Sequence, residues 1–568
     1  MLWKYRPSEP QAADEMAHSL NKPLKFGRFL SGRGFKDSQE VLDFLNADLK
    51  DLPGPETMPG MDKAVELLLD ARRKDSLIAV SGDYDADGLT GTALLKRFLT
   101  GLGFRILTRI PNRLEEGYGL SPTAVRELHQ QQVSLLITVD SGVSDDEAVK
   151  EALKLGLEVI ITDHHNLPPV LPNADAIINP HLGGGWESTA LAGVGVAFML
   201  AWATRKACMS LGLTNEPPSL VEHLCLVALG TIADMSPLIG PNRTMVRHGL
   251  EFLKVSEWPG FVAMRRSLKL DNQTRISVRD VAFKIAPRLN AAGRLGSAEP
   301  ALEILLTQDP IRAEELARRL DELNRQRQET QSELVEEALE MLEHDVSSDG
   351  RTVVLVKEGW PKGVLGLVAS KVAEKSGKPT IILTIEGDMA VGSGRTAGGF
   401  NLYHVLTKVR QLCFSMGGHS QAAGLKLEMS RLEAFKEAFE QAACSEPFNE
   451  AGETELLVDM DADLADLETL ADSLSQLEPF GQGHPAPVFI LRNVKVLDAV
   501  TSKWGRVTLR LSDGFTRQNV SGFNLSSRVL EVGPIMDVAV VFEPDGYNSD
   551  FPWKLLDFKS PVDSNDGL

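Results

Sequence analysis

The sequence predicts an α/β protein in which a parallel-sheet domain is joined by a long helix to a second α/β domain, followed by a small β-barrel. Three observations support this fold class. Apolar strand segments alternate with amphipathic helical segments from about 61 to 185. A helical stretch rich in Arg, Glu, Gln and Leu covers 311–344. Short strand segments separated by turn residues fill the region from about 487 to 558.

The composition is that of an ordinary globular protein. The chain has 568 residues, of which 43% are hydrophobic and 24% charged, and it is too long for one hydrophobic core. No apolar stretch approaches the ~20 residues of a membrane helix, and the first ten residues contain no apolar signal core. We therefore expect no membrane segment and a cytoplasmic location. The four widely spaced cysteines include no CxxC pair, so we expect them to be buried small side chains.

The predicted domain boundaries follow breaks in these patterns. We expect an N-terminal cap at 1–55 that packs on the next domain, a first α/β domain at 56–308, a connecting helix at 309–345, a second α/β domain at 346–446, and an acidic linker with the barrel at 447–568. The net charge of −20 argues against a protein that coats nucleic acid, but it leaves room for a local basic channel. No Lys or Arg occurs between Glu437 and Leu491, so we expect no nucleic acid to cross that face.

Acidic and imidazole side chains follow three predicted strands of the first domain. The segment 77–80 leads into Asp83, Asp85 and Asp87; the segment 135–139 leads into Asp140; and the segment 159–162 leads into Asp163-His164-His165. Ligands of such sheets bind at the carboxyl ends of the strands. Carboxylates this close repel one another unless a multivalent cation lies between them. Oxygen ligands with one or two imidazoles suit Mn2+ or Mg2+ better than a closed zinc site.

Simpler explanations exist for each acidic segment taken alone. A single aspartate after a strand is more often a helix cap than a ligand. The run from Asp83 to Gly88 also resembles a calcium loop, but Leu94 stands where an EF-hand needs its bidentate glutamate. Because three separate strand ends share the feature, a metal site is the better interpretation.

The helical region 191–305 adds further candidates. Its Gly193-Val194-Gly195 lacks the preceding strand of a dinucleotide-binding motif, so we expect close helix packing there. Asp234 ends an apolar helical run. The segment 286–294 places Arg288, Asn290 and Arg294 among small residues; arginine forks bind phosphate oxygens, and a solvated basic loop is an equally good interpretation.

Glycine-rich loops in the second α/β domain, at 392–401 and 417–424, permit close backbone approach to a ligand, and Arg395 and His419 could contact phosphates there. Tight turns alone are the alternative explanation. The terminal barrel is OB-like, and its basic and aromatic residues suit single-stranded nucleic acid, although a purely structural barrel remains a rival. These residues are Lys503, Trp504, Arg506, Arg510 and Arg517.

Taken in order, six motifs of this chain resemble those of the DHH phosphoesterase superfamily, and the terminal OB-like domain resembles its branch of single-strand-specific exonucleases. The motifs are 83–88, 139–142, 162–165, 230–234, 288–291 and 417–419, and the resemblance spans roughly 60–560. It implies that the first domain is a DHH catalytic domain and that the second is a DHHA1 substrate-binding domain. The chain departs from the family pattern at two positions: Pro361 stands where relatives usually have His, and His484 stands where Asn is common. We expect these departures to affect substrate binding and interdomain packing and not the reaction.

The resemblance also implies roles for individual residues. Two Mn2+ or Mg2+ ions are expected on Asp85, Asp87, Asp140, His164 and Asp234, with Asp140 as the bridge. The expected catalytic group comprises His165 on the scissile phosphate, Asp163 orienting the histidines, Asp83 as a nearby carboxylate, and Arg288. The expected substrate-binding residues are Asn290, Arg294, Arg395, Gly418 and His419. Two ions about 3.5 to 4 Å apart can activate water for an in-line displacement, so no protein nucleophile is needed.

The implied function is that of a 5′→3′ exonuclease specific for single-stranded DNA. Such an enzyme releases nucleotides in recombinational and mismatch repair, as a monomer that associates with single-strand-binding protein. A narrow passage between the two α/β domains is expected to exclude duplex. One alternative is a DHH-family oligonucleotide phosphodiesterase or pyrophosphatase, whose chains are usually shorter and lack the barrel. Another is a non-catalytic scaffold, whose expected mark is the loss of metal ligands.

Overall fold

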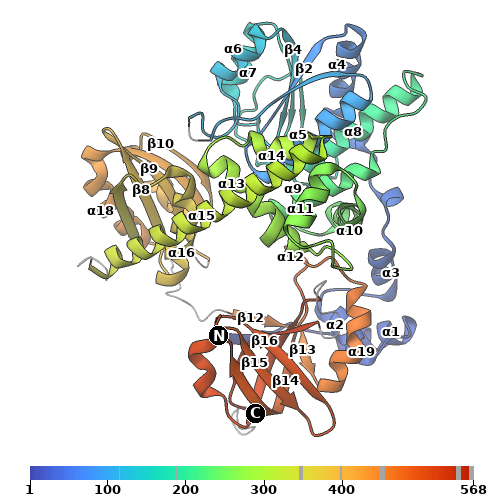
Figure 1. Ribbon diagram of the computed structural model, residues 1–568, viewed down its shortest axis with the longest axis vertical. Helices are drawn as coiled ribbons and strands as arrows, with labels where there is room; N and C mark the ends of the chain where they lie inside the picture. The colour runs from blue at the N-terminus through green and yellow to red at the C-terminus, as the bar shows by residue number, and fades with distance from the viewer. Residues whose placement is uncertain are drawn as a thin grey trace.

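The computed structural model describes residues 1–113, 115–186, 188–344, 350–396, 399–446, 455–544 and 552–561. Figure 1 shows a sheet domain with its attached helices at the top, a second sheet domain to the left, and a barrel below. Helix α15 (Pro310–His344) runs from the first domain to the second. The predicted fold class is therefore confirmed.

The first domain is built on a five-stranded parallel sheet in the order β3-β2-β4-β5-β6. Its strands are β2 (Leu77–Gly82), β3 (Arg105–Arg109), β4 (Val133–Val139), β5 (Glu158–Thr162) and β6 (Ala176–Ile178). Helices α4 (Met61–Arg73) and α5 (Ala86–Gly101) pack on one face, and α6 (Pro122–Gln130) and α7 (Asp146–Lys154) pack on the other. Because both faces are buried, the central strands are almost continuously apolar.

Further helices complete this domain. They are α8 (Gly193–Ser210), α9 (Leu224–Ala233), α10 (Gly240–Val255), α11 (Pro259–Ser267), α12 (Val278–Asp280), α13 (Ala286–Leu295) and α14 (Glu299–Leu306). Helix α9 is apolar on all sides because it lies inside the core, between α5, α8 and α10. A π-helical segment, Val281–Ile285, directly precedes α13.

The second domain has a mixed sheet in the order β10-β11-β9-β8-β7. Its strands are β7 (Val353–Glu358), β8 (Thr380–Glu386), β9 (Met389–Arg395), β10 (Ser415–His419) and β11 (Ala422–Glu428); β7 pairs with β8 in parallel, and the other neighbours pair antiparallel. Its helices are α16 (Lys362–Ser376), α17 (Leu402–Lys408) and α18 (Leu432–Cys444). Ala397 and Gly398 of the predicted glycine-rich loop lie outside the described residues.

The C-terminal domain is a closed barrel. Its strands are β14 (Val488–Thr501), β15 (Val507–Ser512), β16 (Arg517–Gly522), β18 (Trp553–Lys559) and β17 (Ile535–Phe542), and β17 pairs back with β14. The acidic stretch before it is more than the linker that we expected. It forms β12 (Glu455–Val458), β13 (Met460–Ala462) and α19 (Leu464–Ser475), and the leucines of α19 are buried in the barrel core. The first part of that stretch, 447–454, lies outside the described residues.

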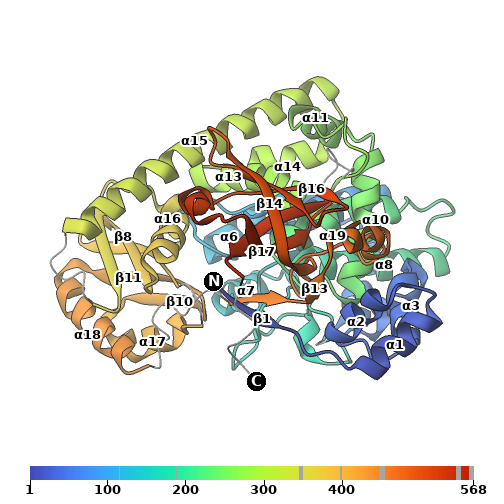
Figure 2. The same ribbon diagram turned by 90° about the horizontal axis from the view of Figure 1, so that it is seen from below.

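The N-terminal segment packs on two partners: its first helices join the barrel, which we did not expect, and its last residues contact the first α/β domain, as expected. Leu49 and Leu52 pack against the core of that domain, and Arg247 donates to the carbonyl of Leu45. Strand β1 (Leu2–Tyr5) pairs with β12, and Phe26, Phe29 and Leu30 join the barrel core. Figure 2 shows α1 (Pro10–Ser19), α2 (Leu24–Gly32) and α3 (Ser38–Asn46) to one side of the barrel, although the barrel comes from the other end of the sequence. The sequence pattern of an amphipathic helix shows which of its faces is buried, but it does not show which domain that face packs against.

The cysteine prediction was right for Cys208 and Cys225, which are buried, and wrong for Cys444, which is exposed at the end of α18; Cys413 is half-buried. Among the described residues, no helix is both long enough and apolar enough to cross a membrane.

Candidate metal centre

The three acidic strand ends lie side by side because β2, β4 and β5 are neighbours in register. Gly82 pairs with Val139, and Val139 pairs with Thr162, so the residue that follows each strand starts at the same edge. The backbone N–H of Asp83 donates to the carbonyl of Val139 over 3.2 Å, and that of Asp140 donates to the carbonyl of Thr162 over 3.0 Å. The topology therefore brings these carboxylates together, as the sequence predicted.

The first turn of α5 supplies two further carboxylates. Asp85 caps the helix and accepts hydrogen bonds from the N–H groups of Asp87 and Gly88. Asp87 is buried, and its two oxygens accept the N–H groups of Gly193 at 2.7 Å and Val194 at 2.8 Å. These donors belong to the first turn of α8, where the helix dipole favours negative charge.

Asp140 occupies a backbone conformation that glycine usually adopts, with φ 59°. Its Cβ lies so close to Gly193 that a Cβ on Gly193 would be 2.6 Å away. The Gly-x-Gly segment therefore does provide close packing, but against a strand end of the metal centre.

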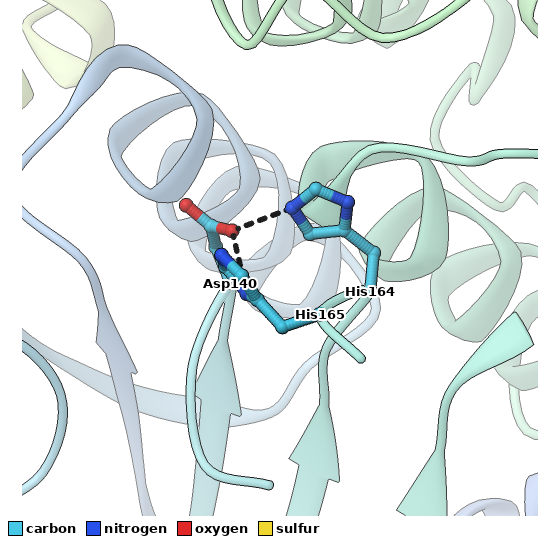
Figure 3. Close-up of side chains that lie close together, drawn as sticks. All are labelled: Asp140, His164 and His165. Carbon is cyan, nitrogen blue, oxygen red and sulfur yellow. Dashed lines mark ion pairs between the residues drawn. The ribbon is translucent and has the colours of Figure 1, made fainter. Parts of the chain in front are cut away.

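Figure 3 shows both imidazoles turned toward the carboxylate of Asp140. Nε2 of His164 lies 3.1 Å from Oδ1 of Asp140, and Nδ1 of His165 lies 3.8 Å from the same oxygen. Nε2 of His164 is also 3.8 Å from Oδ2 of Asp87. Burial lowers the pKa of His164, which favours the neutral imidazole that binds metals.

Asp163 contacts both histidines. Its Oδ1 accepts the backbone N–H groups of His164 at 2.7 Å and of His165 at 3.1 Å, and lies 2.8 Å from Nδ1 of His165. Burial alone would raise the pKa of Asp163, but these hydrogen bonds bring it below its usual value. For His165 burial acts in the other direction and lowers the pKa, but the hydrogen bond and the charge of Asp163 raise it to about 9.

The donor set fits divalent cations. Three groups of side chains each have ligand atoms within 4.8 Å of one another: Asp140, His164 and His165; Asp87, His164 and Asp234; and Asp83, Asp85 and Asp140. Asp140 and His164 are each shared by two groups. The pKa values of Asp83, Asp87 and Asp140 are raised, mainly because the carboxylates are buried and also because they repel neighbouring carboxylates. Within the described part of the chain, Oδ1 of Asp83 and Nε2 of His164 are buried and make no well-aligned hydrogen bond, although Nε2 lies 3.1 Å from Asp140; such atoms are expected to face a cation.

The second domain reaches this centre through the edge strand β10. The ring of His419 stacks on that of His165, with centroids 6.3 Å apart and an interplanar angle of 14°. Gly418 has φ +144°, and a Cβ there would be 2.2 Å from the carbonyl oxygen of Ala422. The end of β10 that presents His419 therefore requires glycine at 418.

The predicted residues of α13 separate into two groups because they lie on different sides of the helix. Nη1 of Arg294 donates to the carbonyl of Gly363 over 3.3 Å, and Oδ1 of Asn290 accepts the N–H of Ala86 over 2.7 Å, at the start of α5. Arg288 instead contacts α15, where its Nε donates to Asp321 over 2.8 Å. The structure thus does not bring the guanidinium of Arg288 to the carboxylates.

Several residues of the site were missed from the sequence. The guanidinium of Arg113 lies over the ring of Tyr84 at 4.8 Å. Burial lowers the pKa values of Arg294 and Arg395, and the positive charge of Arg113 lowers both further. Three guanidiniums are therefore near one another, an arrangement that favours an anion. The other missed groups are the hydroxyls of Tyr118 and Ser236 and the backbone N–H groups of α8; only the glycines around Tyr118 gave any signal.

Three stretches of the chain match family models: 77–231 matches the DHH family, N-terminal domain; 349–444 matches the DHHA1 domain; and 458–550 matches the RecJ OB domain. The single-stranded-DNA-specific exonuclease RecJ of Dickeya dadantii is 37% identical over 500 residues, which cover 84% of this chain and 85% of that protein. The chain belongs to the RecJ family. The RecJ of Bacillus subtilis is 33% identical over 554 residues, covering 96% of this chain and 68% of that protein.

Solved RecJ structures agree with the fold and with the choice of metals. RecJ from Thermus thermophilus in complex with Mn2+ has a TM-score of 0.82 at 30% sequence identity, covering 99% of this chain and 80% of that chain. RecJ from the same organism in complex with Mg2+ has a TM-score of 0.76 at 29% identity, covering 99% of this chain and 79% of that chain. The two metals expected from the residues are thus those present in these relatives.

Proposed function

We propose that this protein is a 5′→3′ exonuclease specific for single-stranded DNA, which uses two Mn2+ or Mg2+ ions to hydrolyse phosphodiester bonds and release nucleotides. The observation that carries the proposal is a cluster of three possible metal-ligand groups, linked through Asp140 and His164, near the guanidiniums of Arg113 and Arg294 from the first domain and Arg395 from the second. The names of the RecJ relatives, which are single-stranded-DNA-specific exonucleases similar to most of this chain, support the same substrate.

In this mechanism Asp85, Asp87, Asp140, His164 and Asp234 hold the two ions. When bound, the ions lower the pKa of a water molecule and stabilise the charge that develops on the phosphate. Protonated His165, held by Asp163, is placed to donate a hydrogen bond to a phosphate oxygen. The N–H groups of α8 keep the Asp87 carboxylate fixed, so little reorganisation accompanies the reaction.

Arg294, Arg395 and His419 are proposed to hold the substrate backbone, with Gly418 allowing the backbone path at the end of β10. Arg113 joins them because its charge acts on both arginines. Asn290 is proposed to act on the site indirectly, by holding the start of α5, because its side-chain oxygen accepts the N–H of Ala86. A direct role for Arg288 requires that its ion pair with Asp321 open first.

The barrel is proposed to bind the strand outside the active site. Trp504 is 78% exposed and Phe515 is 100% exposed, and the ammonium of Lys503 lies 5.0 Å from the Trp504 ring centroid. Three exposed arginines lie on or beside β15 and β16, namely Arg506, Arg510 and Arg517. Exposed rings that can stack on bases, beside cations that can contact phosphates, suit single-stranded DNA without sequence preference.

We also propose that the enzyme acts in recombinational and mismatch repair in the cytoplasm, as a monomer that associates with single-strand-binding protein. The two α/β domains meet where His419 stacks on His165, and we propose that the passage there admits one strand and excludes duplex. No described feature favours the shorter-chain alternatives, which lack a barrel.

Product lengths from 5′- and 3′-labelled DNA test the function. Single and double strands are incubated with the protein in Mn2+ and in Mg2+. Release of labelled mononucleotide from the 5′-labelled single strand, with duplex intact, is the expected result. Turnover of dinucleotides without degradation of long strands would favour an oligonucleotide phosphodiesterase. Absence of hydrolysis in either metal would favour a scaffold.

A further inference from the structure

Tyr118 lies over the metal centre on the loop between β3 and α6. It stands between Gly117, with φ 84°, and Gly119, with φ 82°, which give the loop its tight path. The N–H of Leu120 donates to Oδ2 of Asp145 over 2.8 Å, and this bond anchors the loop. The ring of Tyr118 meets that of His165 edge to face, with centroids 5.7 Å apart.

The hydroxyl of Tyr118 connects two strand ends. It lies 2.8 Å from the backbone carbonyl oxygen of Asp140 and 3.2 Å from Nδ1 of His165. A carbonyl has no proton, so the phenol must donate its single proton to Asp140. Nδ1 of His165 is closer to Asp163, at 2.8 Å, so its proton points to that carboxylate and the phenol oxygen is a weaker second acceptor. Nε2 of His165 then remains available for substrate.

The carbonyl that Tyr118 holds belongs to the residue with the least favourable backbone conformation in the centre. Asp140 has positive φ, and residues in that region persist only where their surroundings fix them. Its N–H is bonded to Thr162, and Gly193 packs against its Cβ, so Tyr118 supplies the remaining constraint, on the peptide that follows.

We propose that Tyr118 is a positioning residue for the metal centre. By holding the carbonyl of Asp140 it fixes the direction of the carboxylate shared by two ligand groups, and by contacting Nδ1 it helps keep His165 in one orientation. The inference rests on the proposed function for its effect on turnover, but its effect on metal binding is independent of that function.

The test compares Tyr118→Phe with Tyr5→Phe. Phenylalanine keeps the ring against His165 and removes only the hydroxyl. Tyr5 is a matched control because its hydroxyl also has two hydrogen-bond partners, Asp461 and Arg492, on the barrel side of the protein. Mn2+ binding without DNA is measured from the electron paramagnetic resonance signal of free Mn2+, and kcat and KM are measured on single-stranded DNA. Thermal unfolding in EDTA verifies that each variant is folded.

We expect Tyr118→Phe to weaken Mn2+ binding by about tenfold, as the loss of groups that orient metal ligands typically does. We expect kcat to fall by about tenfold with little change in KM, because the lost contact fixes reacting groups and not the substrate. Asp145→Ala, which frees the loop from its anchor, is expected to weaken Mn2+ binding in the same direction.

Mn2+ affinity equal to that of the control in both variants overturns the proposal. A raised KM with unchanged Mn2+ affinity also overturns it, because Tyr118 then contacts substrate instead. If the wild type fails to degrade single-stranded DNA while Tyr118→Phe still weakens Mn2+ binding, the function is refuted and the positioning role stands.

Discussion

His484 makes the joint between the barrel and the catalytic domain sensitive to acid. Its ring packs against Phe480 and Phe44, and its Nε2 lies 3.0 Å from the carbonyl oxygen of Leu477. The side chain of Arg243 enters the same joint and donates to the carbonyl of Phe44 over 2.8 Å. Burial, with the charges of Arg33 and Arg243 nearby, lowers the pKa of His484 from 6.5 to about 4.

The direction of the pH effect follows from this shift. Because the folded pKa is below the unfolded one, the unfolded chain binds the proton more tightly, and stability falls as the pH drops below 6.5. The full effect of the shift is about 3 kcal/mol, reached only near pH 4. Between pH 7.5 and pH 5, the expected loss in the free energy of unfolding is about 2 kcal/mol.

The comparison is between wild type and His484→Gln, which keeps an N–H for Leu477 but does not titrate. Urea unfolding is followed by tryptophan fluorescence, because Trp553 is buried in the barrel core. The wild type is expected to lose about 2 kcal/mol more than the variant between the two pH values. An equal loss in both proteins would refute the argument. His223, whose pKa is also lowered to about 4, is unchanged in both proteins and cancels.

Three further predictions concern the site and the barrel. Asp140→Ala is expected to abolish hydrolysis in Mn2+ while the circular dichroism spectrum stays unchanged, and near-normal turnover would contradict the shared-ligand assignment. Gly193→Ala is expected to weaken Mn2+ binding because the new Cβ meets Asp140, whereas Gly32→Ala, whose nearest neighbour is 3.7 Å away, serves as the control in the same titration. Trp504→Ala is expected to weaken binding of single-stranded DNA by about 1 to 3 kcal/mol in fluorescence anisotropy, and unchanged affinity would leave the barrel face without a stacking role.

Much of the candidate site could be predicted because its residues follow strands in a pattern that the parallel sheet turns into proximity. Asp83, Asp140 and Asp163 each come one residue after a strand end, and adjacent strands in register bring them to one edge. Ser236 and Arg113 follow no such pattern, so nothing in their neighbourhood distinguished them from ordinary loop residues. Arg288 fitted a family motif, but it lies on the side of α13 that faces α15, where its guanidinium pairs with Asp321.

The sequence by itself determined the order of domains, the metal-binding edge and the family resemblance, because periodicity and short motifs are properties of neighbouring residues. Only the tertiary structure decided which partners meet. The first N-terminal helices pack on the barrel, and β1 pairs with β12, although Leu2 and its partner Glu455 lie far apart in the sequence. The backbone N–H groups of α8 donate to Asp87. Every residue except proline carries such a donor, so the sequence contains no side chain that would predict this contact. Contacts between distant segments depend on shape and packing, which local patterns do not encode.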